Sequence, residues 1–329
     1  MNLTELKEQI FYSNLTFEEK ALHVFRYQFR ENMIYQAFCR RLNRTPEMVQ
    51  TVLQIPFLPI SCYKQHSILS PSQCSFEVVF ESSGTASQIR SKHYVHDLNL
   101  YVTSFMGAFR QFFGEPEQYC ILGLLPSYLE RPNSSLVYMV KHLIDQSNHP
   151  KSGFFLSNTQ QLSEVLNEME STAQPTLLFG VTFALLDFAR DFPMRLSSTR
   201  IIETGGMKGR GEEMLKAELH AYLKQQFECQ QIYSEYGMTE LLSQAYSTND
   251  DVFYSPSWMS VFIRDLNDPL DIQPTGKGGI QVADLANIHA CSFIATDDLG
   301  EILPDGGFRV HGRIDHSEIR GCSLLSLPF

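Results

Sequence analysis

The feature that most constrains this chain is a regular alternation of β-prone and helix-like segments between residues 76 and 236. Apolar alternation predicts strands at 76–80, 119–125, 175–180, 199–203 and 230–236. Helical periodicity predicts helices between them and after them, at 97–112, 135–146, 159–170, 182–191 and 210–227. This pattern is typical of an α/β sheet with helices on its faces, and ligands of such sheets gather where strands end.

The two ends of the chain have a different texture. A capping box at Thr16 and Glu19 precedes apolar residues at helical spacing, which predicts a helix there and a second one from Met33. After Asp250, short β-prone pieces separated by Pro and Gly turns predict a small β-rich subdomain. We expect an N-terminal helical lobe at 1–75, an α/β core with phosphate loop and adenine site at 76–250, a β-rich subdomain at 251–312, and a hinge remnant and tail at 313–329.

Composition narrows the class of protein. Of 329 residues, 43% are apolar and 12% aromatic, which is ample for a globular core. The formal net charge of −11 disfavours nucleic acid and anionic membranes as partners. We expect a cytoplasmic protein, because the N-terminus has no signal-peptide pattern and no apolar run reaches membrane-spanning length. Seven cysteines without a CxxC pair predict reduced thiols rather than disulfides or a zinc site.

A small-residue loop follows the first predicted strand of the core. It reads SSGTAS at residues 82–87, and Arg90 and Lys92 come directly after it. Backbone N–H groups and hydroxyls in such a loop approach an anion closely, and the two cations add positive charge. The loop has neither the GxxxxGK(S/T) spacing nor the GxGxxG spacing of two common nucleotide motifs. By itself it predicts a phosphate cradle or, alternatively, a plain surface turn.

Further motifs follow later strands in a fixed order. They are ETGGM at 203–207, YGMTE at 236–240, TDDLG at 296–300 and GRID at 312–315. Together with the loop at 82–87, they resemble the adenylate-forming superfamily of acyl-CoA synthetases and AMP-acid ligases. The longer stretches SSGTASQIRSKHYV, ETGGMKGRGEEM and YSEYGMTELLSQAYS are most similar to the acyl-protein synthetase of bacterial luminescence systems. The resemblance runs from about residue 75 to the C-terminus and implies the large N-terminal domain of that fold, with mixed sheets flanked by helices.

The same resemblance implies a reaction. Such a ligase uses ATP and Mg²⁺ to activate a carboxylic acid, here expected to be a fatty or aryl acid, as an acyl-adenylate. The acyl group then passes to a thiol, either of CoA or of an acyl-accepting protein such as a reductase.

The resemblance also assigns residues to this chemistry. The phosphate-binding set is Ser82, Ser83, Gly84, Thr85, Ser87 and Arg90. The adenine-binding set is Gly205, Gly206, Met207, Glu235, Tyr236, Gly237 and Met238. Asp298 and Arg313 would bind the ribose, Glu240 and Thr85 the metal, and Thr239 and Glu240 would act in catalysis. Without the resemblance, Thr239 and Glu240 equally suit a helix N-terminus, and Gly205 and Gly206 an ordinary turn.

Four positions depart from the superfamily pattern. Relatives commonly have glycine, proline and lysine where this chain has Ser87, Ile89 and Arg90. They usually have glycine where Asp297 stands. Arginine keeps the positive charge of lysine and adds a bidentate fork, so the phosphate loop retains a charge partner.

The end of the chain bears on mechanism. Full-length acyl-CoA synthetases continue into a C-terminal domain that carries a catalytic lysine, and we expect that domain to be absent here. In the acyl-protein synthetase alternative, Cys322 near the C-terminus carries the acyl group as a thioester before a partner takes it. A further alternative is a non-catalytic scaffold that binds a nucleotide or an acyl group.

Overall fold

The computed structural model of the chain describes residues 3–71, 75–82, 89–125, 133–155, 158–205, 214–249 and 251–314. The predicted core strands are confirmed as β2 (Val78–Glu81), β4 (Cys120–Leu124), β6 (Thr176–Val181), β7 (Thr199–Thr204) and β8 (Ile232–Tyr236). The predicted helices are confirmed as α5 (Leu98–Phe113), α6 (Ser135–Ser147), α7 (Thr159–Ser171), α8 (Thr182–Asp191) and α9 (Lys216–Gln226).

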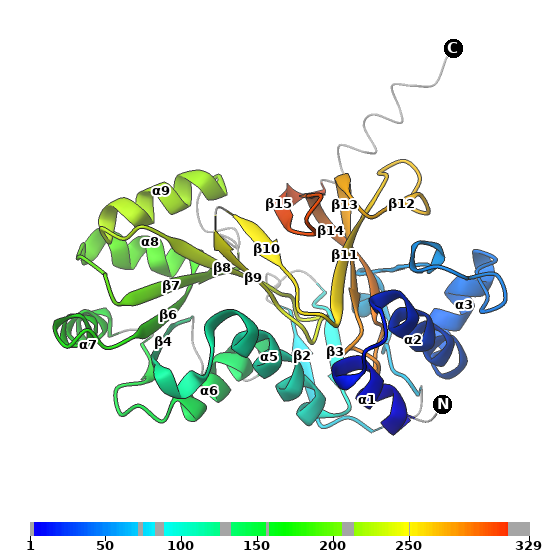
Figure 1. The fold of residues 1–329 in the computed structure, drawn as a ribbon, viewed down its shortest axis with the longest axis horizontal. Coiled ribbons are helices and arrows are strands. Elements are labelled where there is room, and N and C mark those ends of the chain that lie inside the picture. The colour runs from blue at the N-terminus through cyan, green and yellow to red at the C-terminus, as the bar shows by residue number, and fades with distance from the viewer. Residues whose placement is uncertain are drawn as a thin grey trace, which may run out of the picture.

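A parallel sheet forms the first half of the core. β4, β6, β7 and β8 pair in parallel in the order β8-β7-β6-β4, and the short β5 (Gly153–Phe154) continues it beyond β4. Every residue of β4 and of β6 is buried, as expected for strands with helices on both faces. In Figure 1, α8 and α9 lie on one side of these strands, and α5 and α6 lie on the other. The α/β fold predicted from the alternating pattern is therefore confirmed.

Antiparallel strands extend this sheet in the second half of the chain. They are β9 (Ala245–Asn249), β10 (Val252–Tyr254), β11 (Met259–Arg264), β12 (Ile272–Gln273), β13 (Gly276–Asp284), β14 (Phe293–Ile302) and β15 (Phe308–Arg313). The order β8-β9-β10-β15-β14-β13-β11-β12 joins them to the parallel strands. β2 and β3 (Lys92–Val95) pair with each other as a separate antiparallel hairpin. The β-rich region expected after residue 250 is thus present, and its strands continue the core sheet.

The N-terminal region packs on the β13–β14 end of the sheet. It contains α1 (Leu3–Tyr12), α2 (Phe17–Glu31), α3 (Met33–Arg41), a 3-10 turn (Val52–Gln54), β1 (Leu58–Pro59) and α4 (Cys62–Gln65). A second 3-10 turn (Pro116–Gln118) lies outside this region, directly before β4. The predicted capping box is confirmed, since the Thr16 and Glu19 side chains each accept the other's backbone N–H. β1 pairs in parallel with β14, which ties this region to the sheet.

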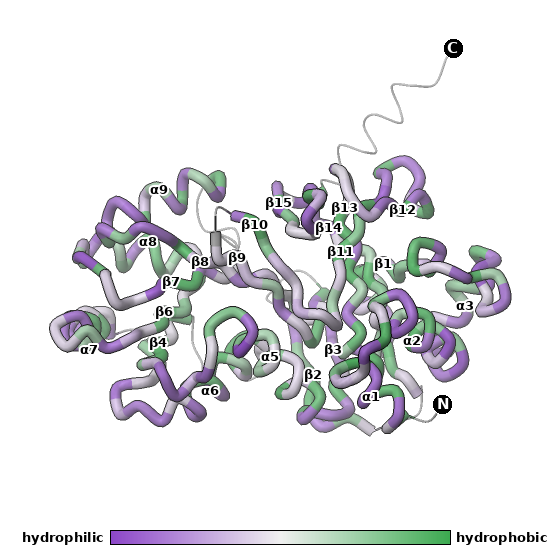
Figure 2. The backbone as a smooth tube through the Cα atoms, viewed as in Figure 1, coloured by the Kyte–Doolittle hydropathy of each residue, from purple (hydrophilic) through white to green (hydrophobic). Residues whose placement is uncertain are grey.

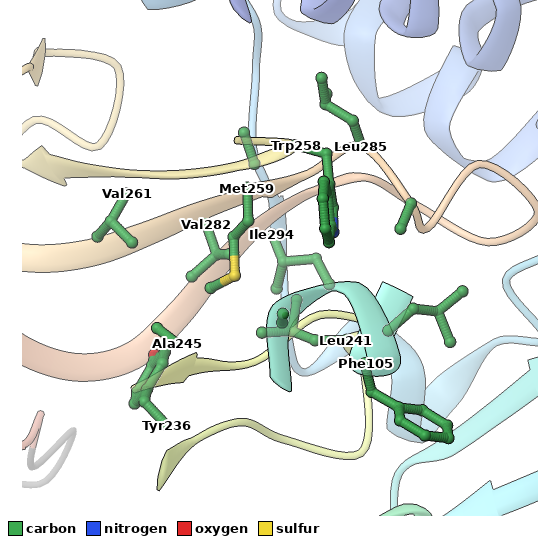
Figure 3. Close-up of a cluster of buried hydrophobic side chains, with 14 of the residues drawn as sticks. Phe105, Tyr236, Leu241, Ala245, Trp258, Met259, Val261, Val282, Leu285 and Ile294 are labelled. Atoms are coloured by element: carbon green, nitrogen blue, oxygen red, sulfur yellow. The ribbon is translucent and has the colours of Figure 1, made fainter. Parts of the chain in front are cut away.

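Two buried apolar clusters hold the layers together. One contains side chains of α7, α8 and α9 and the facing residues of β4, β6 and β7. The other runs from the N-terminal helices through α5 to β11, β13 and β14. Figure 2 shows hydrophobic stretches along the inner strands, and Figure 3 shows Tyr236, Leu241 and Trp258 gathered with Met259 and Val282 in the second cluster. Burial of this size is the main force that fixes the sheet and helices.

No helix in the described ranges is both long enough and apolar enough to cross a lipid bilayer.

Candidate functional site

Three predicted site residues meet where β8 and β15 end beside the middle of β14. The Tyr236 hydroxyl donates to Asp298 Oδ2 at 2.9 Å, and the Arg313 Nε lies 3.4 Å from Asp298 Oδ1. Asp298 and Arg313 are direct partners in the antiparallel β14–β15 register, which places their side chains on one face of the sheet. Residues of β8 and β15 therefore hold a carboxylate of β14.

The environment of this carboxylate suits a polar ligand. Asp298 is only 8% exposed, and burial raises its pKa, whereas the charge of Arg313 and the Tyr236 hydrogen bond oppose the rise. The Arg313 side chain is 77% exposed, so its guanidinium can contact a ligand while it stays near Asp298. The neighbouring Asp297 alternates to the opposite side of β14. Of the two acids, Asp298 is therefore the one that lies with Tyr236 and Arg313.

Glu240 lies close to Ser91, which follows the loop predicted to bind phosphate. Its side chain is 5% exposed, and burial raises its pKa. A hydrogen bond with Ser91 and the positive charges of Arg313 and Lys64 oppose that rise. Ser91 follows the loop at 82–87, so the two motifs predicted to share a site are brought together.

Ser82 and Ser91, on either side of the loop predicted to bind phosphate, are hydrogen-bonded to each other. Ser82 N donates to Ser91 O at 3.1 Å, and Ser91 N donates to Ser82 Oγ at 2.9 Å. Arg90 is half-exposed and lies 3.6 Å from Glu81. Within the predicted phosphate set, the structure therefore describes Ser82 and Arg90. The remaining predicted residues Ser83, Gly84, Thr85, Ser87, Gly206, Met207 and Cys322 lie outside the described ranges.

A buried network beneath Glu240 fixes the turn that carries it. His93 Nδ1 lies 2.7 Å from the backbone oxygen of Thr239, and His93 Nε2 lies 3.0 Å from Asn287 Oδ1. Asn287 Nδ2 in turn donates to the backbone oxygen of Glu240 at 2.8 Å. Burial lowers the pKa of His93 to about 4, so the ring is neutral at pH 7 and donates from one nitrogen only. Residues 237–244 form no helix, and the helix N-terminus considered for Thr239 and Glu240 is wrong.

The predicted adenine end lies beside the ends of β7 and β8. Gly205 has a φ of +71°, and its backbone oxygen accepts from Thr182 Oγ1 at 2.5 Å. A Cβ on Gly237 would lie 2.3 Å from Glu235 Oε1, so a larger residue here would force the buried Glu235 carboxylate to shift. Gly237 itself is exposed, and Met238 is partly buried. This part of the backbone is therefore open to a flat ligand.

The Tyr236 ring has protein neighbours of its own. It packs edge-on against Phe308 at a centroid distance of 5.3 Å and lies 5.9 Å from Phe253. The side chain is 8% exposed, and burial raises the pKa of its hydroxyl. Its described contacts thus position Asp298, and a role of Tyr236 in adenine binding stays a prediction.

The donor set around Glu240 fits a magnesium ion. The described residues contain no group of three or more His, Cys, Asp or Glu side chains that could hold a metal. Mg²⁺ is usually bound by one or two carboxylates, with phosphate oxygens and water completing its shell. A single buried carboxylate beside a phosphate loop matches that preference.

Sequence reasoning missed several residues around the site. His93, Ser91, Asn287 and Lys64 had no assigned role, although each acts on the turn at 239–240 or on the Glu240 carboxylate. For His93, the period of β3 carried a signal, because His93 and Val95 are the buried positions of that strand. No comparable pattern marked Asn287 or Lys64.

The chain is similar to a known protein family and to a known ligase. A family described as "Acyl-protein synthetase, LuxE" matches residues 5–327. A long-chain-fatty-acid–luciferin-component ligase of Vibrio harveyi is 23% identical over 327 residues, covering 91% of this chain and 84% of that protein.

Solved structures of low sequence identity share the fold. A 2-hydroxyisobutyryl-CoA ligase in a postadenylation state superposes with a TM-score of 0.65 at 10% identity, over 91% of this chain and 68% of that one. ATP-bound MatB of Rhodopseudomonas palustris gives a TM-score of 0.54 at 15% identity, over 71% of this chain. The aligned region covers 47% of the MatB chain. Since the family match spans nearly the whole sequence, this chain belongs to the LuxE acyl-protein synthetase family.

Proposed function

We propose that this protein activates a carboxylic acid with ATP, forming an acyl-adenylate and releasing pyrophosphate. The observation that carries the proposal is the Asp298 carboxylate, held by Tyr236 and Arg313 beside the turn that bears Glu240. Membership in the acyl-protein synthetase family and similarity to a fatty-acid ligase support a long-chain acid as the substrate class.

The arrangement suits a nucleotide whose parts differ in charge. The two oxygens of Asp298 match the vicinal hydroxyls of a ribose, and the exposed Arg313 guanidinium adds a donor beside them. The phosphates would then extend toward Ser82, Ser91 and Arg90 at the base of the phosphate loop. The adenine would lie over the open backbone of Gly205 and Gly237.

The chemical step is a displacement at phosphorus. One carboxylate oxygen of the acid forms a bond to the α-phosphorus, and the bond from that phosphorus to the bridging oxygen breaks. The electron pair leaves with pyrophosphate, so no proton has to move. The main work of the protein is to align two anions and neutralise their charge. Glu240 would hold Mg²⁺ with Thr85, and that ion would neutralise phosphate charge.

Direct detection of the product tests this proposal. Mixtures of protein, ATP, Mg²⁺ and a panel of fatty and aryl acids are quenched and analysed for acyl-AMP by mass spectrometry. We expect product with at least one acid and a loss of about 100-fold or more in Glu240→Gln. Glu164→Gln is the matched control, because Glu164 is exposed on α7 and contacts Gln160. ATP binding without acyl-AMP from any acid would favour the non-catalytic scaffold instead.

We also propose that the acyl group passes from the adenylate to Cys322 and then to an acyl-accepting protein such as a reductase. The family match extends to residue 327 and so includes Cys322. The cysteines within the described ranges are poor nucleophiles, since burial raises the pKa of Cys39 to about 12 and of Cys120 to about 11. Burial also raises the pKa values of Cys62, Cys229 and Cys291.

In this second step the Cys322 sulfur attacks the acyl carbon, its thiol proton is lost, and AMP leaves with the electron pair. Radiolabelled fatty acid should therefore stay on denatured protein and be released by neutral hydroxylamine. We expect Cys322→Ser to lose the label while it keeps acyl-AMP formation, and Cys74→Ser to keep both. Label that persists in Cys322→Ser would contradict the proposal that Cys322 carries the acyl group.

A further inference from the structure

The strand that carries Asp298 is irregular at that residue. β11, β13 and β14 are neighbouring strands of the sheet (Figure 1). Gly279 of β13 pairs with Leu299 of β14, and Gln281 pairs with Ala295. A step of two residues on β13 therefore faces a step of four residues on β14, and Asp298 lies within the longer step. Such bulges often lie next to active sites, where they turn a side chain away from its regular direction.

Arg264 of β11 reaches across β13 into this bulge. Its Nη1 donates to the backbone oxygen of Ile280 at 2.9 Å, and its Nη2 donates to that of Thr296 at 2.6 Å. Arg264 is only 9% exposed, and both Ile280 and Thr296 are buried. The guanidinium lies against Gly279, since a Cβ on that residue would be 2.8 Å from Arg264 Cζ. A buried cation thus supplies donors to two buried carbonyl groups.

The same carbonyl groups are linked to Asp298 itself. The Thr296 hydroxyl donates to the Ile280 oxygen at 2.9 Å, and the Asp298 N–H donates to Thr296 Oγ1 at 3.1 Å. One hydroxyl and one carbonyl group therefore join the Asp298 backbone to the Arg264 guanidinium. Burial lowers the pKa of Arg264, and the negative charges of Asp297 and Asp298 oppose that lowering. The hydrogen bonds fix the backbone at Asp298, and the charges favour the same arrangement.

We infer that Arg264 is a positioning residue for ribose binding. It holds the bulge of β14 in the shape that directs the Asp298 carboxylate toward Tyr236 and Arg313. This inference rests on the proposed function, in which Asp298 binds the ribose of ATP. Without Arg264, the buried oxygen of Thr296 loses a charged donor, which favours a different backbone path before Asp298. Arg264 therefore acts on the nucleotide through Asp298.

Calorimetric titration with ATP and with 2′,3′-dideoxy-ATP measures the ribose contact. Both ligands carry adenine and a triphosphate, and they differ only in the ribose hydroxyls that Asp298 binds. We expect wild type to bind ATP about 10- to 100-fold more tightly than the dideoxy analogue, as for hydrogen bonds to a charged group. In Arg264→Met this preference should fall to about threefold or less, while affinity for the analogue stays within about twofold of wild type.

A second variant moves the guanidinium without removing it. Gly279→Ala places a methyl group so close to Arg264 Cζ that the guanidinium has to shift. We expect this variant to weaken the preference for ATP in the same direction as Arg264→Met. Arg264→Lys should show an intermediate preference, because an ammonium keeps the charge but lacks the planar fork that reaches two oxygens. These two variants carry the test if Arg264→Met does not fold.

The matched control is Glu170→Met. Glu170 is also a charged side chain that satisfies backbone groups of the sheet, since it accepts from Ser197 N and Ser198 N at 2.8 and 3.1 Å. These groups precede β7 and so lie at the opposite end of that strand from Gly205. Glu170→Met should therefore keep the wild-type preference for ATP over the dideoxy analogue.

A double variant tests whether Arg264 acts through Asp298. Adding Arg264→Met to Asp298→Asn should cause no further loss of the preference for ATP, because the ribose contact is already weakened. A wild-type preference in folded Arg264→Met overturns the inference, and so does equal weakening of both ligands. If Arg264→Met does not fold, a wild-type preference in Gly279→Ala overturns it. Wild type that binds the two ligands equally well overturns it too.

The titrations contain no acid, so they separate this inference from the proposed reaction. A preference for ATP that depends on Arg264, with no acyl-AMP from any acid, supports the positioning role and contradicts adenylation. Acyl-AMP formation with a preference that survives in Arg264→Met overturns only the role of Arg264. Wild type that binds no ATP overturns both.

Discussion

At the residue scale, the site depends on one carboxylate with two fixed partners. Replacing Asp298 by Asn removes the charge that faces Arg313 and weakens the acceptor for Tyr236. We expect the KM for ATP to rise about 10- to 100-fold in Asp298→Asn, because the ribose loses a charged acceptor. Asp297→Asn, one residue away on the other side of β14, should leave KM within about twofold. Equal changes of the KM for ATP in the two variants would contradict a specific role of Asp298 in ATP binding.

Gly237 tests the packing under the proposed adenine platform. A methyl group there would overlap Glu235 Oε1, which lies 2.3 Å from the ideal Cβ position. We expect Gly237→Ala to lower the free energy of unfolding by about 1–3 kcal/mol, measured by urea denaturation. Gly153→Ala is the control, since a Cβ on Gly153 meets no atom within 4 Å. A Gly237→Ala protein as stable as wild type would mean that the Glu235 side chain can adopt another conformation that makes room for the methyl group.

The residues of the site differ in how well the sequence predicts them. Asp298, Arg313 and Glu240 belong to short motifs whose order along the chain predicts roles in binding ribose and metal, and these roles stay predictions. His93 does not, because its partners Thr239 and Asn287 are 146 and 194 residues away. Its role depends on a fold that brings distant segments together, and one sequence carries no local signal of that contact.

At the element scale, local patterns predicted most of the core. The strands and helices between residues 76 and 236 follow apolar periods that burial enforces on both faces of the sheet. The helix α1 and the two-residue strand β1 were not predicted, because the first has no clear N-terminal signal and the second is too short for a period. The joining of the later strands to the parallel sheet depends on the β9–β10 and β10–β15 pairs, which no local pattern specifies.

The network between β3 and the turn at 239–240 makes a prediction about pH. Burial lowers the pKa of His93 from 6.5 to about 4, so the unfolded chain takes up a proton before the folded protein does. The contribution of the neutral His93 ring to the free energy of unfolding is fully present above pH 6.5 and is lost as the pH falls toward 4. Proton uptake by His93 in the unfolded chain should lower the free energy of unfolding by about 2 kcal/mol when the pH falls from 7 to 5.

Urea denaturation at the two pH values measures this effect. His93→Gln should be less stable than wild type at pH 7 and should lose less stability on acidification. His149→Gln, a change in the turn after α6, should lose as much unfolding free energy between pH 7 and pH 5 as wild type does. An unchanged pH dependence in His93→Gln would mean that the buried ring is not neutral in the folded protein.

At the scale of the whole molecule, the N-terminal helices and the site share one segment. Gln28 of α2 is fully buried, and its side-chain amide donates to backbone oxygens of Asn287 and Ile288 at 3.0 and 3.1 Å. The Gln28 Oε1 accepts from Ser292 N at 3.0 Å. Since Asn287 also holds the Glu240 backbone, α2 supports the turn at 239–240 through the segment at 287–292.

We therefore expect Gln28→Leu to lower the free energy of unfolding by about 2–4 kcal/mol, because it leaves several buried polar groups without partners. Gln36→Leu should cost less than about 1 kcal/mol, since among the described residues the Gln36 side chain donates only to the nearby Phe29 backbone oxygen. Thermal and urea unfolding compare the two variants. Similar costs would show that the Gln28 contacts do not tie α2 to the site.

The most direct test of the central claim is acid-dependent exchange of labelled pyrophosphate into ATP. The full chain with Mg²⁺ should catalyse exchange only when a suitable acid is present, because pyrophosphate re-forms ATP from the acyl-adenylate. The exchange should fall about 100-fold or more in Glu240→Gln and persist in Glu164→Gln. Exchange without acid, or an undiminished rate in Glu240→Gln, would contradict adenylation at this site.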